Sequence, residues 1–107
     1  MIGHYPKHNM LLIDCGWTGC SKQGGEHHYG IFEGTDAGKL KIVNLKQEAG
    51  EVSSDEPIPF EKFPIGTILR LMPWHSCAAS HQHRFIHVLR NSEDATVDEK
   101  WEICKGW

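Results

Sequence analysis

The sequence contains no apolar run long enough to cross a membrane, and no hydrophobic stretch typical of a secretory signal follows Met1. Positive charge is also scarce, because 11 Lys and Arg stand against 14 Asp and Glu and give a formal net charge of -3. Binding to nucleic-acid backbones or to anionic membrane surfaces depends on an excess of positive charge. We therefore expect a cytoplasmic protein whose partners include neither nucleic acid nor a membrane.

Phosphate-binding glycine motifs and doubled zinc motifs are missing as well. The 11 glycines form neither a G-x-x-x-x-G-K-[ST] loop nor a G-x-G-x-x-G turn, and no C-x-x-C pair occurs. Without a secretory signal, the four cysteines are expected to be reduced thiols. Cys15 and Cys20 are spaced too widely for a recognised zinc pair, so we interpret them, together with Cys104, as structural thiols.

The chain of 107 residues has room for one domain, residues 1–107, with a modest hydrophobic core. Apolar and polar residues alternate over several short segments separated by turn-forming residues, and no segment has the helical period of about 3.6 residues. This pattern is typical of an all-β fold, a small barrel or sandwich. We expect strands over residues 10–14, 29–32, 39–45, 69–72, 84–90 and 97–103, a turn over 91–94, and residues 47–52 leading into an irregular, proline-containing connection over 53–64.

Several side chains have a predicted place in this fold. The apolar run at 10–13 predicts a strand buried on both faces, and Asp14 at its end either bonds local backbone groups or faces an active site. His87 alternates with Phe85 and Leu89, which favours a histidine hydrogen-bonded in the core. We further expect two solvated histidines, His27 and His28, and three tryptophans that pack in the core or between domains, Trp17, Trp101 and Trp107.

Residues 69–77 contain the candidate site. They begin as an alternating strand that is expected to end at Pro73, because proline cannot donate to a sheet. His75 and Cys77 follow, and in an extended segment residues i and i+2 point the same way. A converging imidazole and thiolate suit zinc, and two ligands leave tetrahedral positions for water or substrate. The competing interpretation is a surface imidazole beside a small buried thiol, but the region is rich in histidine: His81, His83 and His87.

Three further motifs accompany this segment, which itself extends back to Pro64 as a run over residues 64–77. They are Leu-Ile-Asp-Cys-Gly-Trp at 12–17, Gln-Glu-Ala-Gly at 47–50, and Trp101 with Gly106 and Trp107. Together they resemble the C-terminal domain of eukaryotic-type D-serine dehydratases, whose wider relatives are D-threonine aldolases and D-threo-3-hydroxyaspartate dehydratases. The resemblance covers essentially the whole chain, and its most specific part is the strand followed by Pro-x-His-x-Cys.

The resemblance implies the alanine-racemase-like C-terminal β-domain of a fold-type III pyridoxal-phosphate enzyme. In such enzymes an N-terminal (β/α)8 barrel holds pyridoxal phosphate on a lysine, the β-domain completes the active site, and the full-length protein forms a homodimer. The dehydratases hold zinc with a His-x-Cys pair, which corresponds here to His75 and Cys77. The implied reaction eliminates water from D-serine, a small D-amino acid, and gives pyruvate and ammonia.

The chain is too short to include the barrel, so we expect it to be inactive alone and to have the barrel of the same full-length protein as its partner. Three alternatives stay open. The first is a non-catalytic β-barrel interaction module that retains the motif. The second is the domain of an aldolase-type lyase, although the aldolases typically have His-x-Asp, and the third is a metal-buffering domain that adds His81 or His83 to the pair.

Overall fold

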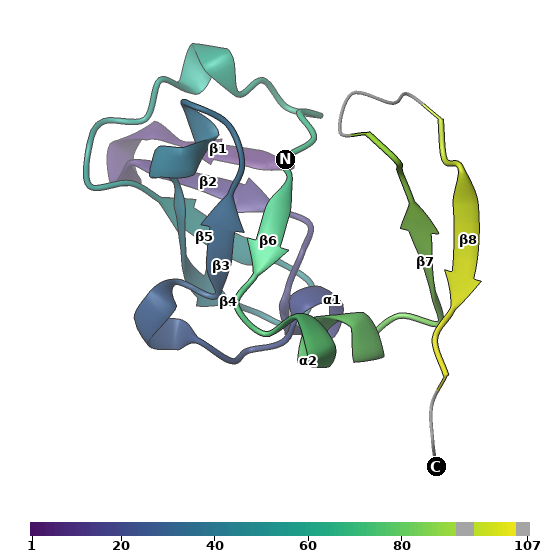
Figure 1. Ribbon diagram of the computed structural model, residues 1–107. Helices are drawn as coiled ribbons and strands as arrows, with labels where there is room; N and C mark the ends of the chain where they lie inside the picture. The colour runs from purple at the N-terminus through teal and green to yellow at the C-terminus, as the bar shows by residue number, and fades with distance from the viewer. Residues whose placement is uncertain (92–95, 105–107) are drawn as a thin grey trace.

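The computed structural model describes residues 1–91 and 96–104, apart from the side chain of His27. Its largest element is a four-stranded antiparallel sheet in the order β1-β2-β5-β4 (Figure 1). In β2 and β5, Leu11 lies opposite Val52 and Ile13 lies opposite Gly50, and on the other side of β5 Ile42 also faces Val52. The bounds of these strands are β1 Gly3–Tyr5, β2 Met10–Ile13, β4 Lys41–Leu45 and β5 Gly50–Ser53.

One face of this sheet forms the core. Period-two alternation turns every second side chain of a strand to the same face, and the most deeply buried side chains therefore come from β2, β4 and β5: Leu11, Ile42, Leu45 and Val52. Phe32 from β3 and Ile58 and Phe63 from the connection after β5 cover them. Burial of each such side chain contributes roughly 1.5–3 kcal/mol relative to an exposed one.

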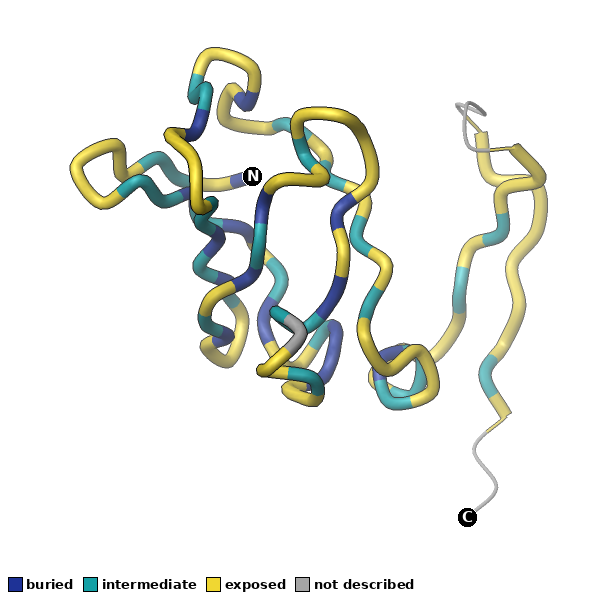
Figure 2. The backbone as a smooth tube through the Cα atoms, turned by 60° about the vertical axis from the view of Figure 1, so that its left-hand side comes forward, coloured by how far each residue is buried: buried dark blue, intermediate teal, exposed yellow. Residues whose placement is uncertain are grey.

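Two smaller sheets have two strands each. β3 (Gly30–Phe32) pairs with β6 (Leu71–Pro73), and β7 (Phe85–Val88) pairs with β8 (Glu99–Glu102). The β3–β6 pair packs on the core through Phe32 and Leu71. The β7–β8 hairpin instead extends away from the rest of the chain in both views, and all four residues of β8 are exposed (Figures 1 and 2).

Helical segments are short. The α-helices are α1 (Trp17–Cys20) and α2 (Ser76–His81), and single 3₁₀ turns lie at Pro6–His8, Gly25–His27, Ala37–Lys39 and Phe60–Lys62. Within the described ranges, no helix has the length and apolar character that a membrane span needs. The helices connect strands, and α1 and α2 lie next to each other at the end of the β3–β6 sheet (Figure 1).

The all-β prediction is confirmed, although the described strands form three small sheets rather than one closed barrel. Two strands were not predicted: β1, and β5 over Gly50–Ser53, which pairs on both sides and takes the first residue of the connection expected over 53–64. The run at 10–13 is not buried on both faces, since Leu11 and Ile13 are buried and their neighbours are only half-buried. The reason is that the sheet has its core on a single face.

The aromatic predictions for the C-terminal part are also corrected. His87 is exposed rather than in the core, because β7 belongs to the outlying hairpin, and Trp101 on β8 is 54% exposed. Trp17 is exposed at the start of α1, so neither of these tryptophans is a core residue, and packing between domains stays a prediction for both. Most of the turn expected over 91–94, the packing expected for Trp107 and the Gly106 motif lie outside the described residues.

Candidate functional site

The junction between β6 and α2 holds the predicted metal ligands. The strand ends at Pro73 as expected, and the amide of Trp74 still donates to the carbonyl of Tyr29 at 2.9 Å. His75 has an extended backbone and precedes the first helical residue, while its carbonyl oxygen accepts from Ala79 at 3.0 Å. Cys77 lies in the first turn of α2, and both side chains are exposed.

The extended geometry expected for His75 and Cys77 is therefore wrong. The chain becomes helical at Ser76, and residues two apart on a helix do not face each other as they do on a strand. The pair is presented from a strand-to-helix junction, with the imidazole on the last extended residue and the thiol on the helix. Exposure of both groups leaves them accessible to a ligand from outside the described chain.

A glutamine distant in sequence orients the imidazole of His75. Its Nδ1 is hydrogen-bonded to Oε1 of Gln23, from the loop after α1. An amide oxygen only accepts, so this contact requires the tautomer in which Nδ1 carries the proton and Nε2 keeps its lone pair. Metal-binding histidines in proteins are commonly oriented by such a bond from the second ring nitrogen.

The loop that carries Gln23 fits closely against Trp74. Gly24 has a φ of 88°, and a Cβ on it would lie 2.3 Å from the Trp74 ring. The Gln23 amide donates to the Ser21 hydroxyl at 3.2 Å, which fixes the start of the loop. Glycine at position 24 therefore lets the loop approach the residue immediately before His75.

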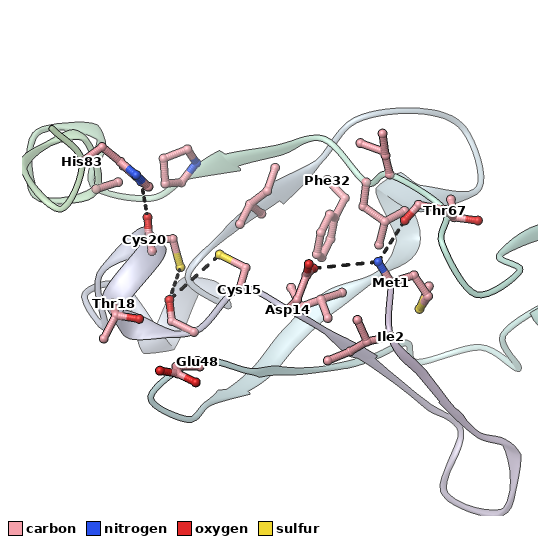
Figure 3. Close-up of a pocket in the computed structure, with 18 of the residues that line it drawn as sticks. Met1, Ile2, Asp14, Cys15, Thr18, Cys20, Phe32, Glu48, Thr67 and His83 are labelled. Carbon is pink, nitrogen blue, oxygen red and sulfur yellow. Dashed lines mark hydrogen bonds and ion pairs between the residues drawn. The ribbon is translucent and has the colours of Figure 1, made fainter. Parts of the chain in front are cut away.

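A cavity of about 1040 Å³ opens beside this junction, between α1, α2, β6 and the start of the chain (Figure 3). Ser76, Ala79 and Ser80 of α2 line it, whereas His75 and Cys77 do not. Asp14 lies at its wall, with its carboxylate 4.0 Å from the Met1 amine, so it faces a cavity rather than only the local backbone. The predicted metal pair and this cavity are thus neighbours at the start of α2.

Two thiols meet at the wall of this cavity. Cys15 precedes the N-cap of α1 and Cys20 is the last residue of that helix, and their sulfur atoms lie 4.0 and 3.5 Å from the carbonyl oxygen of Gly16 (Figure 3). The hydrogen bond from Cys20 lowers the pKa of Cys15 to about 7, although burial and the charge of Asp14 act to raise it. The same bond, together with burial, raises the pKa of Cys20.

The contact between Cys15 and Cys20 was not predicted, since both were interpreted as separate structural thiols. Cys15 is the residue before the N-cap Gly16, and Cys20 is the fourth residue of the helix. Side chains at these two positions commonly touch at helix starts, so the Cys-Gly-x-x-x-Cys spacing was the available signal. Cys104, the third expected structural thiol, is exposed.

Backbone contacts hold α1 in place. The amides of Trp17 and Thr18 donate to the carbonyls of Lys46 and Gln47 at 3.0 and 3.2 Å, so the turn between β4 and β5 satisfies the free N–H groups of the helix start. A Cβ on Gly16 would lie 2.4 Å from the carbonyl oxygen of Gln47, so only glycine allows this approach.

The histidines near the pair are not assembled around it. Nε2 of His83 is hydrogen-bonded to the carbonyl oxygen of Gly19 at 2.7 Å, which ties the end of α2 to α1. Across residues 1–91 and 96–104, no three His, Cys, Asp or Glu side chains are placed to hold a metal ion together. The ligand set expected for a metal-buffering domain, His75 and Cys77 with His81 or His83, is therefore not formed.

Comparisons with known proteins agree on one family. Residues 1–89 match the family model described as "Putative serine dehydratase domain". The chain is 32% identical to a D-serine dehydratase of Dictyostelium discoideum and 28% identical to a D-threo-3-hydroxyaspartate dehydratase of Delftia sp. (strain HT23), over 100% of its own length. It spans only 29% and 31% of the lengths of these two relatives.

Solved structures share the fold. An alanine-racemase-like protein from Idiomarina loihiensis matches 99% of this chain and 30% of its own, with a TM-score of 0.81 and 32% identity. Two mutants of D-threo-3-hydroxyaspartate dehydratase also match 99% of this chain with a TM-score of 0.81. The first is 25% identical and is matched over 31% of its own chain, and the second is 26% identical and is matched over 30%. One is a cysteine-to-alanine mutant in the metal-free form, and the other replaces a histidine two positions earlier.

Proposed function

Because the chain belongs to the serine dehydratase domain family, we propose that it is the metal-bearing C-terminal domain of a zinc- and pyridoxal-phosphate-dependent D-serine dehydratase. The full-length protein would add an N-terminal (β/α)8 barrel that binds pyridoxal phosphate and would form a homodimer. The share of the relatives that the chain covers, 29% and 31%, supports a domain of a larger protein. D-serine is proposed over D-threo-3-hydroxyaspartate because identity to the D-serine dehydratase is higher.

His75 and Cys77 are the proposed zinc ligands. The observation that supports them most directly is the contact of Gln23 with Nδ1 of His75, which leaves Nε2 as the ring nitrogen available to a metal, while the thiol of Cys77 is exposed two residues later. Nitrogen and thiolate sulfur are the donors that zinc prefers. The His-x-Cys spacing also equals the separation of the two residues mutated in the related dehydratase, whose cysteine mutant was solved in a metal-free form.

In this proposal the chain's residues position the metal. His75 and Cys77 supply two of four tetrahedral positions, and the remaining ones are left for water, substrate or the barrel. Gln23 keeps the imidazole in the tautomer that binds through Nε2. Zinc held by these residues would supply Lewis-acid stabilisation of the departing β-hydroxyl of D-serine, a poor leaving group, and pyridoxal phosphate in the barrel would supply electron withdrawal at Cα.

A zinc titration of the purified chain tests this assignment. We expect saturable binding of one zinc ion by isothermal titration calorimetry, and loss of that binding in a His75→Ala, Cys77→Ala double variant, because both donors are removed. A matched His87→Ala, Cys104→Ala variant removes the same residue types from the exposed C-terminal part and is expected to bind as the unmodified chain does.

Zinc binding that persists unchanged in the His75→Ala, Cys77→Ala variant would contradict the proposed ligands. Equal loss in the control variant would show that binding depends on histidine and cysteine content rather than on this junction. Circular dichroism of each variant separates loss of ligands from loss of the fold.

A further inference from the structure

The contact between Cys15 and Cys20 has no role in the proposed metal chemistry, yet the two thiols line the same cavity. We propose that Cys15 and Cys20 form a reversible intramolecular disulfide when the chain meets a hydroperoxide. This modification site is independent of His75 and Cys77, so it does not rest on the proposed function.

The local fold brings the two sulfur atoms together. They belong to the residue before the N-cap of α1 and to the last residue of that helix, and both are directed at the carbonyl oxygen of Gly16 (Figure 3). The position of α1 is fixed from outside by the turn between β4 and β5 and by His83. Cys15 and Cys20 are therefore held near each other before any bond forms.

The two thiols have different properties, which assigns their roles. Cys15 is half-buried at the cavity wall, and its pKa of about 7 gives a large thiolate fraction at neutral pH. Cys20 is only 6% exposed and stays protonated, since its pKa is raised by the hydrogen bond to Cys15 and by burial. Cys15 is thus the attacking thiolate, and Cys20 is the resolving thiol.

The reaction has two steps. The Cys15 thiolate attacks one oxygen of hydrogen peroxide, an S–O bond forms as the O–O bond breaks, and the leaving hydroxide takes up a proton to give water. The sulfur of Cys20 then attacks the sulfenic sulfur of Cys15, the S–S bond forms and the S–O bond breaks. The departing hydroxide accepts the Cys20 thiol proton and leaves as a second water, so peroxide is reduced as two thiols are oxidised. An external dithiol reverses the change by exchange.

Peptide mapping of the full chain tests the proposal. Trypsin releases residues 8–22 as a peptide that contains Cys15 and Cys20 and no other cysteine. After treatment of the reduced chain with equimolar hydrogen peroxide and alkylation, we expect this peptide to lack both alkyl groups and to have lost two hydrogen atoms. Reduction by dithiothreitol before alkylation should restore both alkyl groups. The exposed Cys104 in the peptide 101–105 provides an internal comparison and should remain mostly alkylated.

Two results would overturn the proposal. One is a peptide 8–22 that keeps both alkyl groups at a peroxide dose that already oxidises Cys104. The other is oxidation of this peptide to sulfinic acid, or its linkage to another cysteine peptide, in place of the internal bond.

A Cys20→Ser variant adds an independent measurement, because removal of the resolving thiol should leave a sulfenic acid on Cys15 that dimedone labels.

Discussion

Cys15 is a thiol whose pKa is lowered to about 7. A hydrogen bond from Cys20 stabilises its thiolate, whereas burial and the negative charge of Asp14 oppose ionisation, and the hydrogen bond is the largest of these effects. Two other titratable side chains, Glu48 and His83, line the same cavity. The thiol should therefore be protonated below about pH 7 and ionised above it.

This balance predicts a pH profile. Alkylation of Cys15 by iodoacetamide should rise with pH through a midpoint of about 7, because only the thiolate reacts. In a Cys20→Ala variant the stabilising hydrogen bond is lost while Asp14 remains, so the midpoint should move up to 9 or higher. Mass spectrometry of the peptide 8–22 reports the rate at each pH.

A Thr18→Ala variant is the control for this measurement. It alters the same short helix, removing a hydroxyl that donates to the carbonyl of Gln47, but leaves both thiols in place. Its midpoint should stay near 7. An unchanged midpoint in Cys20→Ala would mean that the hydrogen bond does not set the pKa of Cys15.

For single residues, the sequence indicates candidate ligands better than it indicates contacts between distant side chains. The spacing of His75 and Cys77 after a strand makes them candidate metal ligands. Gln23, however, lies 52 residues from His75, and no periodicity connects the two. Cys15 and Cys20 were interpreted as separate structural thiols, because their contact depends on a helix that begins at Trp17. A four-residue helix spans barely one turn, too short for a 3.6-residue period to be recognised.

At the scale of elements, glycine placement decides how the loop after α1 meets the start of α2. Gly24 and Gly34 both have positive φ, 88° and 102°, so alanine at either position is strained by about 1–2 kcal/mol. Only at Gly24 would the added Cβ also collide with the Trp74 ring, since the nearest atom to Gly34 is 4.0 Å away. Alanine at Gly34 therefore introduces backbone strain alone, whereas alanine at Gly24 introduces the same strain and also displaces the loop from Trp74.

This difference gives a second prediction. Gly24→Ala should weaken zinc binding about 10–100-fold, because a shifted loop takes Gln23 away from His75. Gly34→Ala should lose similar stability in urea unfolding but keep its zinc affinity. Calorimetry and unfolding curves on both variants provide the comparison. Equal zinc affinities in the two variants would show that Gln23 does not orient the ligand.

A strand was predicted over residues 39–45 and β4 is found within that range, but simple alternation does not predict which of its side chains face the core. In β4 the register shifts between Ile42 and Asn44, which leaves Val43 exposed and returns Leu45 to the core. Such a bulge adds one residue to the strand, so period-two reasoning fails beyond it. β5 was not predicted because Gly50-Glu51-Val52-Ser53 has only one apolar side chain and therefore no alternation. Its pairing with both β2 and β4 depends on strands that are distant from it in the sequence.

For the whole molecule, the two small sheets differ in what stabilises them. The β3–β6 pair packs on the core through Phe32 and Leu71, whereas the β7–β8 hairpin extends away from it. Sequence alternation in β8 resembled a half-buried strand, but all four of its residues are exposed. Alternation shows that a strand has an apolar face, and whether that face is covered depends on neighbours that the local pattern does not encode.

Hydrogen exchange should therefore divide the chain into two parts. A two-stranded hairpin without a covered face is marginally stable in water, so amides of β7 and β8 should exchange by local opening with a free energy near zero. Amides that pair β2, β5 and β4 should require global unfolding, about 5–15 kcal/mol for a typical domain. The β3–β6 pair is the matched comparison, because it has as few strands but contacts the core, and its amides should be protected. Equal exchange rates in the two small sheets would contradict this, and would mean that the hairpin is held by contacts beyond its own ladder.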